Sequence, residues 1–353
     1  MTQGPRAGII SGMRFGRLAD GWDGETGLSD TTGTLAPPQK PSRRIGVLDL
    51  ARGLALFAMA TYHFSWDLEL FGYLEPGTTT HGLFKAYARS IAGSFLFLAG
   101  VSLVLAHGKG VRPTAFIRRV AMVAGAAALI SLVTYFATPD SFIYFGILHA
   151  IAASSVIGLA FLRLPVLLTV LAGIVCIGLP GFYRHELFNP AWLSWIGLFT
   201  VPPRSNDFVP LMPWLGPFLV GMGLTKYAVS QNLTERLAAF DTGTGPAARA
   251  TRFCGRHSLA FYLVHQPVLL SFVWVASQII PATPADPLPA FVSECEIGCE
   301  ANNSVAFCKR FCGCVTDELL SQELFQPFIS GQITQDSDAR IPAIIEQCTA
   351  TSH

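Results

Sequence analysis

Charged residues are scarce in this chain of 353 residues: they make up 13% of it, whereas hydrophobic residues make up 51%. A soluble globular domain needs roughly 25% charged residues, so the composition excludes an ordinary soluble enzyme. An excess of one charge sign is also missing, since 24 Lys and Arg residues stand against 23 Asp and Glu residues. Such a chain has no long-range field that attracts nucleic acid, and we expect no nucleic-acid partner. The composition is typical of a protein that is embedded in a lipid bilayer.

Residues 1–42 lack an apolar run long enough for the core of a signal peptide, and they are rich in Gly, Thr, Asp and Pro. We predict a disordered cytoplasmic tail there. A membrane-spanning helix needs about 20 residues to cross about 30 Å of hydrocarbon. Seven later blocks meet this requirement: 45–65, 86–107, 118–137, 142–162, 164–182, 209–227 and 256–280. The predicted fold is an all-α integral membrane bundle of about seven transmembrane helices within residues 43–280.

The distribution of Lys and Arg residues predicts the orientation of this bundle. With the N-terminus in the cytoplasm, 16 of the 24 cations fall in cytoplasmic segments and six on the opposite side, while Arg52 and Arg89 fall within spans. Cytoplasmic loops of membrane proteins carry such an excess of cations. The predicted topology therefore has the N-terminus inside and the C-terminus outside, with residues 281–353 forming a small helical domain on the outer side.

Six of the eight cysteines lie in that outer segment, at positions Cys295, Cys299, Cys308, Cys312, Cys314 and Cys348. Disulfides persist in oxidising compartments, which agrees with the predicted topology. Cys295 and Cys299 are four residues apart, as are Cys308 and Cys312, so each pair shares one face of a helix. Bridges 295–312 and 299–308 would staple a helical hairpin and leave 314–348 as a third, a pattern that resembles twin CX3C hairpins. Six cysteines allow about 15 pairings, and a zinc site is the alternative, although its usual spacings and an adjacent histidine are missing.

The first predicted span carries three ionisable residues, Asp49, Arg52 and His63. Each such group at membrane depth costs roughly 2.5–3.5 kcal/mol unless it has a partner or lies in a water-filled cavity. Arg52 and His63 share one helix face, because eleven positions give about three turns plus 20° and a rise of about 16 Å. This spacing suits a long anionic ligand from the cytoplasm, with Arg52 on its phosphates and His63 at its reacting carbon. The alternative is an Asp49–Arg52 ion pair and an interfacial histidine.

Further polar residues lie in or beside the other spans. His149 and His265 fall within the fourth and seventh spans. Either one alone is more often a helix-packing residue, but several buried ionisable groups in one bundle favour convergence on a cavity. At the outer face we expect a substrate mouth that consists of Asp67, His81, Arg89, Asp207 and Trp214.

The inner start of the seventh span is a candidate phosphate site. Arg256, His257 and Ser258 follow Gly255 and offer a cation, a hydroxyl group and free amides at a helix N-terminus. Alternatively, these residues only anchor the cytoplasmic end of the span, as cations commonly do; the sequence favours both interpretations equally. The sequence contains no Walker loop, HExxH or GxSxG motif.

Six stretches of the chain, in order, resemble the heparan-alpha-glucosaminide N-acetyltransferase catalytic-domain family, in particular its bacterial branch. They are 44–55 (RIGVLDLARGLA), 62–68 (YHFSWDL), 95–102 (FLFLAGVS), 145–151 (FGILHAI), 210–216 (PLMPWLG) and 255–267 (GRHSLAFYLVHQP). Arg52 and His63 are also similar to the R-x10-H pattern of the broader transmembrane acyltransferase group.

The resemblance implies transfer of an acetyl or other acyl group from acetyl-CoA or another acyl-CoA in the cytoplasm to a sugar amine or hydroxyl in the periplasm. Together with the topology predicted above, it implies a multi-pass protein of the bacterial inner membrane with a periplasmic glycan or amino sugar as acceptor. We predict no metal, and the protein could form a homodimer. Arg52, helped by Arg256, would hold the CoA phosphates, and His63 would act as general base or accept the acyl group. His149 and His265 would line the tunnel, and Asp49 or Asp67 would orient partners.

Two alternatives from other classes remain at this point. A transporter or flippase would use the buried charges as a substrate or proton path and would not consume CoA. Alternatively, the spans would only anchor the cysteine-rich domain as an interaction module, in which case deletion of 285–353 would abolish function and substitution of Arg52 would not.

Overall fold

The computed structural model describes residues 45–282, 286–300 and 303–352. Within these ranges the chain is helical, with fourteen α-helices and three short 3₁₀ helices, and no residue there is in a β-strand. The all-α prediction is confirmed for this part of the chain. The predicted cytoplasmic tail, residues 1–42, lies outside the described residues.

A helix occurs at each of the seven predicted spans. In chain order they are α1 (Gly46–Leu70), α2 (Gly82–His107), α3 (Pro113–Ala137), α4 (Ile147–Phe161), α5 (Val166–Phe182), α7 (Leu211–Ser230) and α10 (Ser258–Ile279). Between them lie the 3₁₀ helices η1 (Thr78–Thr80), η2 (Pro139–Ser141) and η3 (Glu186–Phe188), and the shorter helices α6 (Ala191–Ser194), α8 (Leu233–Ala239) and α9 (Pro246–Arg256). Four more helices follow, α11 (Pro287–Glu300), α12 (Val305–Ser321), α13 (Phe325–Ile329) and α14 (Arg340–Thr351).

Three of the described helices, α2, α3 and α10, are both long and apolar enough to cross a membrane. Helices α4 and α5 are apolar but shorter. Helices α1 and α7 have 25 and 20 residues, so what sets them apart from the three is their less apolar composition. Helices therefore lie at all seven predicted positions, and three of them have the length and apolar composition of a membrane span. Among the polar residues of α1 are Asp49, Arg52 and His63, which belong to the candidate site.

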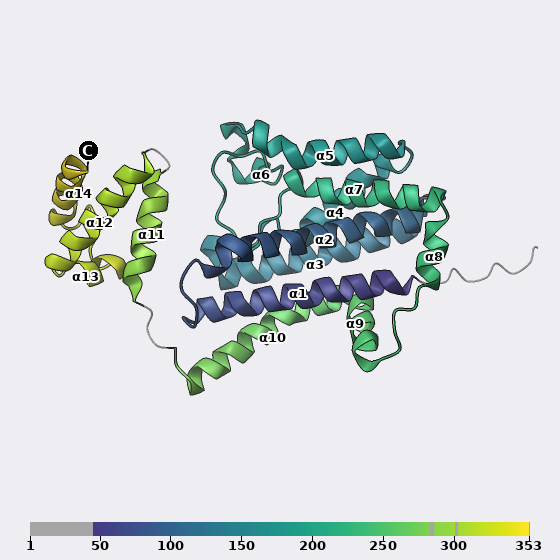
Figure 1. Ribbon diagram of the computed structural model, residues 1–353, viewed down its shortest axis with the longest axis horizontal. Helices are drawn as coiled ribbons and strands as arrows, with labels where there is room; N and C mark the ends of the chain where they lie inside the picture. Colours follow the sequence, from purple (N-terminus) through teal and green to yellow (C-terminus); the bar gives the residue numbers. More distant parts are fainter. Residues whose placement is uncertain (1–44, 283–285, 301–302, 353) are drawn as a thin grey trace, which may run out of the picture. The chain divides into compact units, whose positions relative to one another are not determined.

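Helix α7 lies side by side with α2 and with α5, while α1 lies against α2, α9 and α10 (Figure 1). The largest apolar core joins α2, α4 and α7 and contains the fully buried residues Leu96, Ala150, Phe218 and Met222. Glycines allow the backbones of α2 and α7 to approach closely: a Cβ atom on Gly100 would lie 2.1 Å from the Phe218 carbonyl oxygen. Small residues at such contacts are typical of helix packing in membranes.

We expect Gly100→Ala to destabilise the protein, because the added methyl group would meet backbone that has no rotamer to change. Overpacking of this kind costs about 1–3 kcal/mol. Gly125→Ala on α3 is the matched control, since its added Cβ would have no neighbour within 4 Å. Thermal unfolding of both variants in lipid nanodiscs tests the contact. Equal stability of the two variants would contradict it.

Glycines also bring α9 against the beginning of α1. A Cβ atom on Gly255 would lie 1.8 Å from the Asp49 carbonyl oxygen, and one on Gly53 would lie 2.0 Å from the Thr251 carbonyl oxygen. Because both obstacles are backbone atoms, neither position accepts a side chain without a shift of the helices. This contact brings Arg256 near the first charged residues of α1.

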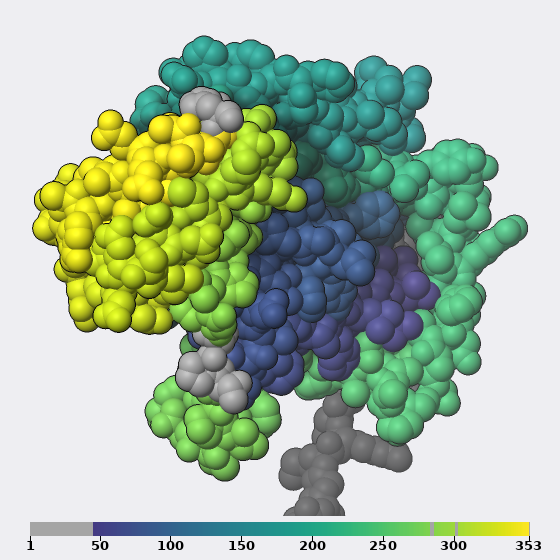
Figure 2. Space-filling view, turned by 60° about the vertical axis from the view of Figure 1, so that its left-hand side comes forward, coloured from purple at the N-terminus to yellow at the C-terminus, as the bar shows by residue number. Residues whose placement is uncertain are grey.

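The C-terminal helices pack as a compact group around a core of their own (yellow and yellow-green in Figure 2). The core contains Leu319, Phe325, Ile341 and Ile344. Disulfides link Cys295 to Cys312, Cys299 to Cys308 and Cys314 to Cys348. The predicted pairing is confirmed, and all six sulfur atoms that the zinc alternative needs are used in disulfides.

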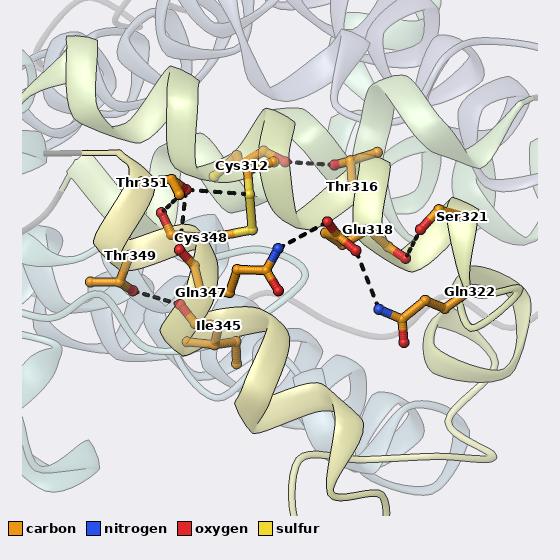
Figure 3. The surroundings of a disulfide bond; sticks show 11 residues. Cys312, Thr316, Glu318, Ser321, Gln322, Ile345, Gln347, Cys348, Thr349 and Thr351 are labelled. Carbon is orange, nitrogen blue, oxygen red and sulfur yellow. Dashed lines mark hydrogen bonds between the residues drawn. A yellow bond between two sulfur atoms is a disulfide. The ribbon is translucent and has the colours of Figure 1, made fainter.

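Hydrogen bonds add to the third disulfide in joining α12 to α14. Figure 3 shows the Glu318 carboxylate of α12 accepting hydrogen bonds from Gln322 and from Gln347 of α14. The predicted helical and disulfide-stapled character of this segment is therefore present in the structure.

Candidate active site

The first candidate cluster lies where the beginning of α1 meets the end of α2 and the end of α9. Arg52 Nη1 donates to Asp49 Oδ1 at 3.1 Å, and Arg52 Nη2 donates to Ser102 Oγ at 2.6 Å. Arg256 Nε lies 3.9 Å from the second oxygen of Asp49. We call Asp49, Arg52, Ser102, Arg119 and Arg256 the arginine cluster; the structure brings the predicted residues Asp49, Arg52 and Arg256 together in it.

Arg119 on α3 belongs to this cluster because it lies close enough to Arg52 for the two cations to repel each other. Asp49 is the carboxylate that forms ion pairs with Arg52 and Arg256 in the described residues. One carboxylate cannot neutralise three guanidinium groups, so the cluster has a net positive charge. Guanidinium groups bind phosphate in a planar, two-pronged geometry, and the cluster therefore suits an anionic phosphate-bearing ligand.

The second cluster lies further along α1, where it packs against the middle of α10. The rings of His63 and His265 meet edge to face, with centroids 5.1 Å apart. Gln266 Nε2 donates to Asp67 Oδ1 at 2.7 Å. His265 is 8% exposed and Asp67 is fully buried. We call His63, Asp67, His265 and Gln266 the histidine cluster.

Several buried polar atoms around the histidine cluster have no hydrogen-bond partner among the described residues. They are Asp67 Oδ2, Thr79 Oγ1, His265 Nε2 and Gln266 Oε1. Buried polar atoms are almost always hydrogen-bonded in native proteins, because an unsatisfied one costs about 1–3 kcal/mol. A concentration of unsatisfied atoms in one place therefore favours a site that a polar ligand completes.

Helix α1 connects the two clusters. Arg52 and His63 lie in the same uninterrupted helix, so the predicted separation of about 16 Å along its axis holds. Between them α1 packs through the buried residues Leu56 and Met59, together with Tyr62, Tyr87 and Tyr262 at the edge of that core. The site thus has a cationic end and a histidine end along one largely apolar helix face.

His149 and Asp207 stabilise the beginning of α4. His149 Nδ1 accepts from the Gly146 backbone N–H at 3.2 Å, and Asp207 Oδ2 accepts from the Ile147 N–H at 3.0 Å. These contacts satisfy free amides at a helix N-terminus, where a negative charge is also favourable. Asp207 precedes α7 in a connecting segment; burial raises its pKa above the ordinary value, and its hydrogen bonds with Ile147 and Tyr262 oppose this shift.

The residues of the expected substrate mouth have individual local contacts in the structure. His81 Nδ1 is hydrogen-bonded close by, at 2.9 Å from the Gly77 carbonyl oxygen, and Trp214 packs beside Gly93 of α2. Asp67 belongs to the histidine cluster instead. Arg89, which lies within the second predicted span, is exposed in the first turns of α2, before Ile91, the first buried residue of that helix.

The candidate phosphate site, Gly255 to Ser258, lies where α9 ends and α10 begins. Only His257 separates α9 from α10, and its Nδ1 lies 3.0 Å from the Phe253 carbonyl oxygen. His257 therefore contacts its own preceding helix. Arg256 is the residue of this segment that reaches the arginine cluster.

Sequence reasoning did not single out Ser102, Arg119, Tyr262 or Gln266. Arg119 follows Arg118 at the start of a span, where any cation looks like a membrane anchor. Ser102 and Gln266 are ordinary polar residues of long helices, and nothing in their own segments shows which partner they face. Tyr262 lies one turn before His265, and that spacing is the one local signal that it shares its face.

Residues 44–267 match the protein family described as "Heparan-alpha-glucosaminide N-acetyltransferase, catalytic". The matched range is more than half of the chain and includes every residue of the arginine and histidine clusters. Comparisons with the curated proteins and with the solved structures gave no match.

Proposed function

Since the chain belongs to the heparan-alpha-glucosaminide N-acetyltransferase catalytic family, we propose that it is a membrane-bound acetyltransferase. It takes the acetyl or another acyl group from a cytoplasmic acyl-CoA and transfers it to an amine or hydroxyl group of a sugar on the other side. The observation that carries this proposal is the pair of clusters on α1, one cationic and one with two histidines. A phosphate-bearing carrier bound at one end would present its acyl group at the other.

The arginine cluster holds the donor in this proposal. Arg52 and Arg256 bind phosphate groups of the acyl-CoA, and Arg119 adds a third positive charge. Asp49 and Ser102 position Arg52, because both hydrogen-bond its guanidinium group. An arginine side chain that is already held in place loses less conformational entropy when it binds a ligand.

The histidine cluster carries the chemistry. A neutral imidazole of His63 either removes the proton from the attacking amine or hydroxyl, or attacks the thioester carbon and becomes acylated. In the first route, the C–S bond of the thioester breaks as the acceptor attacks. In the second, CoA leaves before the acceptor is acylated. His265 lies in ring contact with His63 and serves either route.

The three disulfides support a C-terminus on the oxidising side of the membrane. With the excess of cations in the opposite loops, they favour a protein of the bacterial inner membrane with a cytoplasmic N-terminus and a periplasmic glycan or amino sugar as acceptor. Mass mapping of unreduced protein from its native membrane tests this arrangement. Free thiols at these six positions would contradict both the bridges and the orientation.

Acetyl-CoA consumption by the purified full-length protein tests the function. In nanodiscs, we expect release of free CoA that depends on an added amino sugar or sugar, with the acetylated product detected by mass spectrometry. We also expect acetyl-CoA to raise the melting temperature. Flux of a solute through proteoliposomes without CoA release would instead support a transporter, and no response to acetyl-CoA at all would contradict the proposal.

A further inference from the structure

The unsatisfied atoms of the histidine cluster have one chemical property in common. His265 Nδ1 lies 2.6 Å from the Tyr262 carbonyl oxygen. A carbonyl oxygen has no proton to donate, so Nδ1 carries the proton, and in the neutral ring the lone pair is on Nε2. His265 Nε2 is therefore a hydrogen-bond acceptor, and it is buried without a partner among the described residues.

The neighbouring residues add two more acceptors. The amide nitrogen of Gln266 donates to Asp67 Oδ1, which identifies Gln266 Oε1 as the carbonyl oxygen, an acceptor only. Asp67 Oδ2 is an acceptor in the ionised carboxylate, and Asp67 forms no ion pair in the part of the chain that the structure describes. Both atoms are buried and unsatisfied. All three orphan atoms thus require a donor that these side chains do not supply.

We propose that His265 Nε2, Asp67 Oδ2 and Gln266 Oε1 form the subsite for the acyl acceptor, and that His265 takes the proton of its attacking hydroxyl or amine. This inference rests on the proposed function. Its basis is the placement of three acceptor atoms on adjacent residues of α10 and on the facing turn of α1. A hydroxyl-rich or amine-bearing molecule supplies the missing donors, whereas a purely apolar one leaves them unsatisfied.

With His265 as the base, His63 has the acyl-accepting role. In the first step a nitrogen of His63 attacks the thioester carbon, the C–S bond breaks, and the leaving sulfur takes the proton that the His63 ring loses. In the second step the acceptor passes its proton to His265 Nε2 and attacks the acyl carbon. The bond from that carbon to His63 breaks, and its electron pair and the proton on His265 restore the neutral His63 ring. The products are the acylated acceptor and free CoA.

His265→Asn separates the two steps, because the asparagine amide still donates towards Tyr262 but has no counterpart of Nε2. We expect the first release of CoA, measured in a single turnover, to stay within about 3-fold of the parent protein. Steady-state transfer to D-glucosamine or methyl α-D-glucoside should fall about 100-fold or more, with acylated His63 accumulating. A loss that is merely structural would slow both steps, so equal slowing of the two, or unchanged transfer, would overturn the proposal.

Gln266→Leu and Asp67→Asn test the binding atoms. We expect each to raise KM for the sugar about 10-fold, as the loss of one or two hydrogen bonds implies, and to leave KM for acetyl-CoA unchanged. Gln278→Leu is the matched control, because Gln278 is exposed on the same helix and, among the described residues, its side chain bonds the adjacent Ser277. An equal change in KM for both substrates, or the same change in the control, would contradict the subsite.

Calorimetric titration with D-glucosamine or methyl α-D-glucoside, in the absence of acetyl-CoA, measures sugar binding to the subsite separately from the reaction. Binding that is lost in Gln266→Leu and kept in Gln278→Leu supports the subsite even where no acyl transfer occurs. If the protein transfers the acyl group but substitutions of Asp67, His265 and Gln266 change neither sugar binding nor turnover, the proposed function stands and this inference alone is overturned.

Discussion

Arg52→Ala should reduce kcat/KM for acetyl-CoA by about 100-fold or more. The substitution removes the guanidinium group that joins Asp49 to Ser102, and it removes a charge-assisted contact to phosphate that is worth about 1.5–3 kcal/mol. It also makes the cluster less positive by one charge, which adds to the loss. The initial rate of CoA release at varied acetyl-CoA concentration measures the effect.

Two variants separate this binding role from a loss of fold. Arg52→Lys keeps the positive charge and loses the planar, two-pronged contact, so we expect a smaller effect that is confined to KM. Arg118→Ala removes an exposed cation from α3, next to Arg119, and should change the rate less than about 2-fold. If Arg118→Ala and Arg52→Ala lowered the rate equally, the loss would reflect the general charge of this end of the bundle.

His63→Ala should abolish acyl transfer, with a fall of at least about 100-fold in kcat. Among the described residues, His63 is the α1 side chain whose ring contacts His265, and an imidazole can act as a nucleophile or a base near neutral pH. The parent protein, quenched in acid during turnover, should yield an acylated peptide that contains His63. The peptide from His63→Ala should carry no such group.

His185→Ala is the control for this experiment, because His185 lies in the exposed segment before η3 and accepts a hydrogen bond from Leu187 there. It should retain full activity. Full activity of His63→Ala towards a good acceptor would show that His63 takes no part in the reaction. A loss of activity without any acylated peptide in the parent protein would favour the single-step route in which His63 is a base.

Much of the fold follows from local composition. Each helix of the bundle coincides with an apolar block because, in a bilayer, the backbone must satisfy its hydrogen bonds within the segment. The spacing of Cys295, Cys299, Cys308 and Cys312 was informative for a related reason, since i and i+4 positions share a helix face and antiparallel helices can match two such pairs. The confirmed pairing includes the third bridge, which follows once the first two are formed.

The candidate site was less accessible to such reasoning. The common face of Arg52 and His63 follows from helix geometry, because both residues lie on α1. By contrast, His149 and His265 look alike in the sequence, as single histidines in apolar helices. The structure gives His149 a local contact at the start of α4 and gives His265 a ring contact with His63.

The sequence by itself determined where the seven long helices lie, which residues of α1 share a face and to which family the chain belongs. Its cysteine spacing predicted the pairing that the structure confirms. These properties depend on residues that are near one another in the chain or on a pattern that runs along it. Only the tertiary structure decided that Arg119 joins Arg52, that Gln266 bonds Asp67 and that Arg89 is exposed. These contacts depend on how each helix is rotated about its axis, and in an apolar bundle that rotation is set by close packing at positions such as Gly100 and Gly255.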